Sequence, residues 1–200
     1  MEGRASEPGN IVPMAAAFEA SLAVVALGLG WLLDTHPLAT WKWEPVALGW
    51  GLVAVIPLFV LLWLMVRFPI GPLGSLVKIV DELVISMFQR ASFFDLAMIS
   101  LMAGIGEEFL FRGVVQAWLV QLTGSQWVGL IGAGVLFGLI HSITRTYAVV
   151  AAVVGVYLGW LWMATGNLLS PVVAHAVYDF GALWYLRHTS KGRVDGSAVP

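Results

Sequence analysis

Six long apolar runs follow one another along the chain and constrain its fold more than any other feature. A helix needs about 20 mostly apolar residues to cross a bilayer. Hydrophobic residues make up 60% of the 200 residues and charged residues only 11%, with a mean hydropathy of +0.89. The sequence therefore predicts an all-α fold, a polytopic membrane helical bundle with about six spanning helices. The expected spans lie near residues 12–33, 45–66, 93–122, 126–143, 147–165 and 168–186.

The segment between the second and third runs, residues 67–92, has a different pattern. Its apolar residues recur at helical spacing, and Lys78, Asp81 and Glu82 take the other side. This pattern favours one amphipathic helix on the membrane surface, although a re-entrant or spanning segment stays open.

The chain shows no internal repeat and no second hydrophobic unit. We therefore expect a single membrane-embedded domain over residues 1–200, with a motif-bearing core at 93–186. The polar ends, residues 1–10 and 188–200, are interpreted as short tails.

Basic residues indicate the orientation, because cytoplasmic loops are enriched in Lys and Arg. With six spans and both termini inside, only Lys42 faces outward, and Arg112 lies within a span. The remaining basic residues face the cytoplasm: Arg4, Arg67, Lys78, Arg90, Arg145, Arg187, Lys191 and Arg193. We expect an integral protein of the plasma (inner) membrane with both termini cytoplasmic.

Charge and cysteine content exclude several classes of function. The net charge is −2 and the basic residues are spread among loops, so nucleic acid is not an expected partner. Without cysteine the chain has no disulfide, no thiolate nucleophile and no cysteine-bound metal.

Two adjacent carboxylates and a guanidinium lie in the middle of the third apolar run. Glu108 and Arg112 are four residues apart, so on a helix they share a face and can pair. Glu107 points about 100° away. Because Arg112 favours ionised Glu108, Glu107 is the carboxylate free to act as a general base toward water. A purely structural ion pair is the alternative, against which the cost of three charges in lipid argues.

Two more polar groups interrupt the later runs. His141 ends the fourth run, where a lone histidine is more often an interfacial side chain. His175 and Asp179 are four residues apart in the last run, with Ser170 expected to cap that helix. Asp179 can then orient the His175 imidazole, unless the two only stabilise the helix.

Together, the order and spacing of these groups resemble the CPBP family, the CAAX proteases and bacteriocin-processing enzymes. The shared pattern is Glu-Glu-x-x-x-Arg, then Phe-x-x-x-His, then His-x-x-x-Asn or Asp, and it spans Phe93 to Leu186. The resemblance implies an intramembrane endopeptidase in contact with the lipid bilayer. Its substrate would be a peptide or protein, lipid-modified in one branch of the family, whereas other branches act in bacteriocin self-immunity or peptide maturation.

The resemblance also implies a role for each residue. Glu107 activates water, Glu108 and Arg112 organise the site, His141 helps to hold or activate the water, and His175 with Asp179 stabilises the tetrahedral oxyanion. Many members of the family have Asn at the last position. Asp179 keeps an acceptor but lacks the amide donor, so orienting His175 is the role we expect for it.

A divalent metal such as zinc is a separate question, because the family is commonly labelled metalloprotease. Glu107, His141 and His175 would supply three ligands and leave a fourth position for water. However, the chain has no His-Glu-x-x-His spacing to preset two ligands on one helix. The sequence therefore leaves the metal open.

Two functions from other classes stay open. A proton-coupled carrier predicts flux that depends on a pH gradient and tolerance of Glu107→Asp. A catalytically inactive membrane scaffold or immunity protein predicts that Glu107→Gln leaves the biological effect intact. Glu19, near the start of the first run, is interpreted as an interfacial or helix-start residue rather than as part of the site.

The predicted spans raise one conflict of depth. His141 lies near the cytoplasmic end of its predicted helix, whereas His175 lies about two turns from the outer end of its own. Either the span boundaries or the shared site is wrong. Glycines at 129, 132, 134 and 138 make the boundaries of the fourth span the weaker assumption.

Overall fold

The computed structural model describes the backbone of residues 11–194, and the side chains in that range except those of 84–86 and 190–194. Short turns join its helices, and residues 11–194 contain no strand, so the predicted all-α membrane bundle is confirmed. Within this range three helices are long and apolar enough to cross a membrane by themselves. They are α1 (Ile11–Leu32), α2 (Pro45–Arg67) and α7 (Arg145–Thr165). The predicted total of six spans stays a prediction.

The other apolar runs are helical too, but in less regular form. The third run is one continuous helical rod, in which α4 (Phe93–Glu108) passes into the π-helix η2 (Phe109–Gln116) and then into α5 (Ala117–Thr123). Helix α6 (Gln126–Ile140) is short and apolar, and α8 (Leu169–Val194) is the longest helix described.

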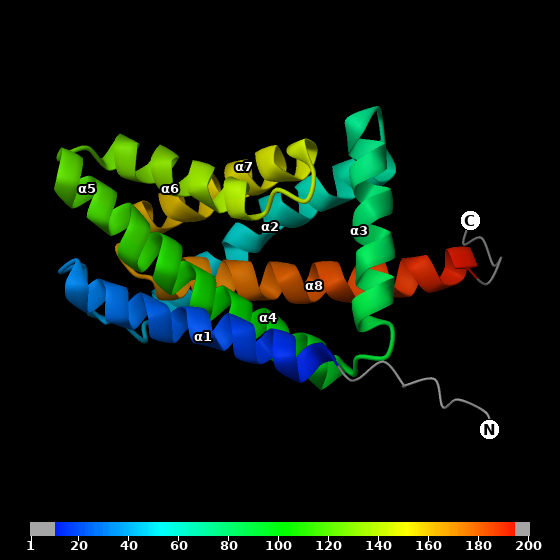
Figure 1. The fold of residues 1–200 in the computed structure, drawn as a ribbon, viewed down its shortest axis with the longest axis horizontal. Coiled ribbons are helices and arrows are strands. Elements are labelled where there is room, and N and C mark those ends of the chain that lie inside the picture. Colours follow the sequence, from blue (N-terminus) through cyan, green and yellow to red (C-terminus); the bar gives the residue numbers. More distant parts are fainter. Residues whose placement is uncertain (1–10, 195–200) are drawn as a thin grey trace, which may run out of the picture.

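The long segments alternate in direction along the bundle (Figure 1). The first residues of α1 and the last turns of α8 lie at the same end. A short 3-10 helix, η1 (Pro37–Thr40), lies between α1 and α2 at the opposite end. This arrangement suits six crossings with both ends of the described chain on one side, although the side that faces the cytoplasm stays a prediction.

The amphipathic segment forms α3 (Pro72–Phe88), so the predicted helix is confirmed. It does not run along the bundle but crosses it steeply near one end, packed against α8 and α2 (Figure 1). Leu76 and Phe88 are buried on its inner side, whereas Lys78 and Glu82 are exposed. Helix α3 therefore covers one end of the interior.

Helix α8 continues to Val194, through the first part of the predicted tail 188–200, while 1–10 and 195–200 lie outside the described residues. One sequence prediction about the start of α8 is wrong. Ser170 does not cap the helix. The Asn167 side chain accepts the hydrogen bond from the Leu169 N–H at 3.0 Å, and the Ser170 hydroxyl instead donates to the Ala47 carbonyl at 2.9 Å. Because Ser170 lies against α2, its hydroxyl is used to join two helices.

Small residues let the helices that carry the site approach closely. A Cβ at Gly51 in α2 would lie 2.7 Å from both the Ser170 carbonyl oxygen and the Val173 Cβ of α8. A Cβ at Gly104 in α4 would lie 2.9 Å from the Ala176 Cβ, also on α8. Close approach through small residues is a usual basis of helix packing in membranes. Helix α8 is thereby held between α2 and α4.

We predict that Gly51→Ala lowers the free energy of unfolding in mixed micelles by about 1–3 kcal/mol, because the added methyl overpacks the contact with α8. Gly49→Ala is the matched control, two residues away on α2, where a Cβ meets nothing within 4 Å. Equal stability of the two variants would contradict this close packing.

Candidate active site

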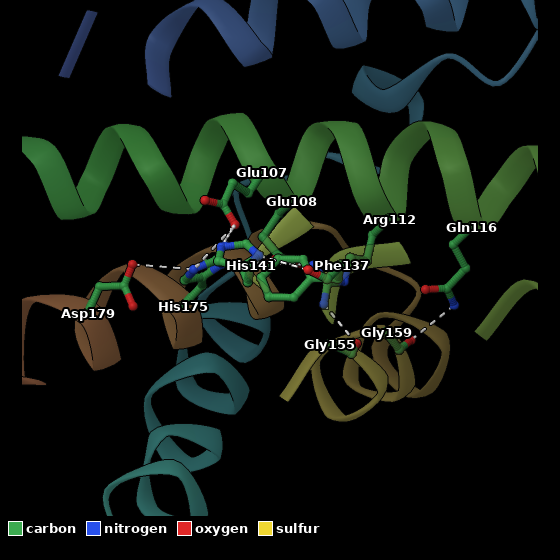
Figure 2. Close-up of polar contacts among 10 residues, drawn as sticks. All are labelled: Glu107, Glu108, Arg112, Gln116, Phe137, His141, Gly155, Gly159, His175 and Asp179. Atoms are coloured by element: carbon green, nitrogen blue, oxygen red, sulfur yellow. Dashed lines mark hydrogen bonds and ion pairs between the residues drawn. The ribbon is translucent and has the colours of Figure 1, made fainter. Parts of the chain in front are cut away.

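Arg112 is the central anchor of a buried polar network. Its side chain is only 1% exposed, and its Nη1 donates to Glu108 Oε1 at 2.8 Å. Its Nη2 donates to the Gly155 carbonyl of α7 at 2.7 Å, and its guanidinium lies 4.9 Å from the centre of the Phe137 ring of α6. One side chain thus ties η2 to α6 and α7 (Figure 2).

A second buried side chain repeats this contact one turn along. Gln116 Nε2 donates to the Gly159 carbonyl at 3.3 Å, so Arg112 and Gln116 each bond to a carbonyl of α7, four residues apart in both helices. Sequence analysis missed Gln116, although its place four residues after Arg112 in an apolar run was a usable signal. These contacts fix the register of η2 on α7.

Glu108 connects Arg112 to the histidine of α8. Its side chain is fully buried, and its Oε1 accepts from His175 Nδ1 at 2.7 Å as well as from Arg112. Asp179 Oδ2 lies 3.3 Å from the other ring nitrogen of His175, Nε2. The sequence suggested Asp179 alone as the residue that orients His175. The structure gives the shorter contact to Glu108 and places Asp179 on the opposite side of the ring.

His141 is oriented by its own helix. It is the C-terminal cap of α6, where its Nδ1 lies 2.8 Å from the Phe137 carbonyl and its ring stacks on the Phe137 ring with centres 4.3 Å apart. A carbonyl is an acceptor only, so Nδ1 carries the hydrogen. In the neutral imidazole Nε2 is then an acceptor, and it faces Glu107 Oε2 at 3.6 Å.

Glu107 is the carboxylate on which the two histidines converge (Figure 2). Its Oε2 lies 3.6 Å from His141 Nε2 and 4.0 Å from His175 Nε2, and it has no hydrogen-bond partner among the described residues. Two groups can share one water when they are separated by less than about 5.6 Å, twice a usual hydrogen bond. The structure therefore brings all six predicted site residues together, with Glu107 placed to share a water with each histidine.

The conflict of depth does not arise in the structure. Helix α6 has 15 residues and is about 22 Å long, so it is shorter than a full crossing of the bilayer. Its C-terminal end, which His141 caps, therefore lies at the depth of His175 in the second turn of α8. The boundary of the fourth predicted span was wrong, and the side chains of His141 and His175 both lie close to Glu107.

The donor set does not fit a bound metal. The described residues hold no group of three or more His, Asp or Glu side chains placed to bind a metal ion. The two ring nitrogens of His175 face carboxylate oxygens at 2.7 Å and 3.3 Å, which favours the imidazolium form of the ring. In that form both nitrogens carry a hydrogen, and neither has a lone pair for a metal.

The structure also corrects the sequence interpretation of Glu19. Its side chain lines the same cavity as Glu107 and Asp179, and its Oε2 has no hydrogen-bond partner among the described residues. The interpretation as a simple interfacial residue is therefore wrong. In the sequence, Gly106 was only a weak indication that another helix packs closely beside Glu107. In the structure that helix is α1, because a Cβ on Gly106 would overlap the Glu19 carbonyl.

Fold and site together define a helical membrane protein with a buried cluster of carboxylates and histidines. Residues 89–181 match the family model described as Rce1-like, type II CAAX prenyl endopeptidase Rce1-like. This match covers 93 of the 200 residues and supports a CPBP/CAAX intramembrane protease family for that segment. No curated protein and no solved structure is significantly similar to the chain.

We predict that Arg112→Lys lowers the free energy of unfolding in mixed micelles by about 1.5–3 kcal/mol, the cost of one lost charge-assisted hydrogen bond. Lysine keeps the charge but cannot reach Glu108 and Gly155 together with the planar geometry of a guanidinium. Arg67→Lys, at the exposed end of α2, is the control and should be neutral. If both variants unfold alike, Arg112 does not anchor the site.

Proposed function

We propose that this protein is an intramembrane endopeptidase in which Glu107 activates a water molecule to hydrolyse a peptide bond. The observation that carries the proposal is the convergence of His141 and His175 on Glu107, which itself lines a cavity. The match of residues 89–181 to the Rce1-like family model supports the same reaction. The carboxylate, the two imidazoles and the space for a substrate lie within one helical bundle.

The geometry of Glu107 and His141 supports the activation of water. Both Glu107 Oε2 and His141 Nε2 are acceptors in the arrangement above, at 3.6 Å from each other. A water between them donates one hydrogen to each, which leaves an oxygen lone pair for attack on a peptide carbonyl. As the C–O bond forms, Glu107 takes the proton of the water. When the C–N bond breaks, the leaving amine takes that proton from Glu107.

His175 is placed to stabilise the negative charge that develops on the carbonyl oxygen. Glu108 holds its Nδ1 at 2.7 Å, so the ring is fixed before substrate binds. Its Nε2 points to the space between Glu107 and Asp179, where an oxyanion can accept its hydrogen. Glu108 and Arg112 act by positioning His175, and Asp179 supports the ring from the opposite side.

Substrate and location follow from the same proposal. The substrate is a peptide or protein segment that enters from the bilayer, and it includes lipid-modified chains if the protein acts as the type II CAAX prenyl endopeptidases of the matching family model do. The apolar helices place the protein in a membrane, for which we propose the plasma (inner) membrane with cytoplasmic termini.

We predict that Glu107→Gln lowers kcat/KM for peptide cleavage by about 10²–10⁴-fold in proteoliposomes, the usual contribution of a general base. Glu82→Gln, an exposed carboxylate on α3, is the matched control and should keep full activity. Cleavage by Glu107→Gln at the wild-type rate would contradict the mechanism. A wild-type protein that cleaves no peptide would instead favour an inactive scaffold or a carrier.

We predict that EDTA leaves cleavage by the wild-type protein unchanged, because the donor set does not fit a metal ion. The measurement is kcat/KM before and after dialysis against the chelator, followed by addition of zinc. Loss of activity that zinc restores would contradict this account and return Glu107, His141 and His175 to the role of metal ligands.

A further inference from the structure

A cavity of about 360 Å³ lies beside Glu107 and is lined by residues of α1, α2, α3, α4, α7 and α8. Most of its wall is aliphatic, and it runs from Glu107 toward the crossing helix α3. Side chains from α2, α3 and α8 supply this apolar part, among them Leu62, Met65, Val66, Leu76, Val80 and Leu186. The cavity is therefore suited to an apolar segment of chain next to the proposed site of cleavage.

Two polar groups interrupt this apolar wall without serving the reaction. Ser100 of α4 is 2% exposed and lines the cavity, and its Oγ has no hydrogen-bond partner among the described residues. Glu19 Oε2, on the α1 side, also lacks a partner there. Buried polar groups are nearly always hydrogen-bonded in folded proteins. Two such groups at one cavity therefore point to a ligand that satisfies both.

The charge of the wall indicates the sign of that ligand. Glu19, Glu107 and Asp179 all line the cavity, and among the side chains that the structure describes no lysine or arginine lines it. Arg112 is engaged elsewhere, by Glu108 and the Gly155 carbonyl. A carboxylate taken out of water needs a cation or a strong donor beside it. The missing group is therefore a cationic donor.

The spacing on α4 gives the distance of this subsite from the reaction. Ser100 precedes Glu107 by seven residues, which is two turns on the same helix face and about 10.5 Å. An extended peptide covers that distance in about three residues. A side chain that reaches Ser100 thus belongs to a residue within about three positions of the scissile bond, and Glu19 lies nearer to Glu107, because its carbonyl packs against Gly106.

We propose that Glu19 and Ser100 form a specificity subsite that binds a lysine or arginine side chain of the substrate. The stem of such a residue lies along the aliphatic wall, while its charged head donates to the Glu19 carboxylate and the Ser100 hydroxyl. This inference rests on the proposed function, because it names the substrate that the same site takes. It makes Glu19 a residue that selects substrate rather than one that reacts.

The test uses the wild-type protein in phosphatidylcholine vesicles with a set of synthetic apolar peptides. Each peptide carries a single lysine, norleucine or glutamate, moved through the three positions on either side of the cleaved bond. We expect one position at which kcat/KM for lysine exceeds that for norleucine by about tenfold, with glutamate poorer still. Glu19→Gln should bring the ratio of lysine to norleucine close to one, and Glu19→Asp should keep part of it.

The readout is the ratio of kcat/KM for the lysine peptide to that for the norleucine peptide on the same protein. Partial misfolding of a variant lowers both values alike and leaves this ratio unchanged. Glu82→Gln is the matched control, because it removes a carboxylate of α3 that lies outside the cavity. A lysine preference that Glu19→Gln leaves unchanged overturns the proposal, as does the absence of any lysine preference at all six positions.

A binding arm separates this inference from the proposed function. In the Glu107→Gln background, fluorescently labelled lysine and norleucine peptides are titrated onto the protein, with and without Glu19→Gln. One outcome is that the wild-type protein cleaves no peptide, but the lysine peptide still binds about tenfold tighter than the norleucine peptide and loses this advantage in Glu19→Gln. The subsite then stands and the hydrolytic function fails. If the peptides are cleaved but bind equally well, the subsite fails and the hydrolytic function stands.

Discussion

The buried contact between Arg112 and Glu108 is the constraint on which the rest of the site depends. A guanidinium inside a membrane bundle needs partners for its charge and its donors. Here Glu108, the Gly155 carbonyl and the Phe137 ring supply them, while the Arg112 Nε has no hydrogen-bond partner among the described residues. Each partner comes from a different part of the chain, so satisfying one residue fixes η2, α6 and α7 against one another. Through its contact with His175, Glu108 extends the same network to α8.

This network explains how two neighbouring glutamates acquire different surroundings. Successive residues of a helix point about 100° apart. Glu108 therefore faces the anchor, fully buried and bonded to Arg112 and His175, whereas Glu107 faces the cavity, where its Oε2 has no hydrogen-bond partner among the described residues. The first carboxylate provides rigidity and the second is left for chemistry. In our proposal the fixed His175 ring and the free Glu107 carboxylate meet at one water.

The local features of the site were predictable from the sequence, because they depend on spacing within one helix. The pairing of Glu108 with Arg112 and the nearness of His175 to Asp179 both follow from residues four apart. The contact of His175 with Glu108, the cavity position of Glu19 and the depth of His141 were not predictable. They depend on the register between helices and on the short length of α6, which an apolar pattern in one sequence does not determine. The π-helical turn after Glu108 also lacks a signal in the sequence.

The most direct test is a high-resolution structure of the wild-type protein in a lipid environment, with the water molecules of the site resolved. Our account predicts an ordered water within hydrogen-bond distance of both Glu107 Oε2 and His141 Nε2, close to a His175 ring held by Glu108. A separation of Glu107 and His141 beyond about 5.6 Å would contradict it, since no single water can then contact both. An ion with anomalous scattering in place of that water would contradict it equally.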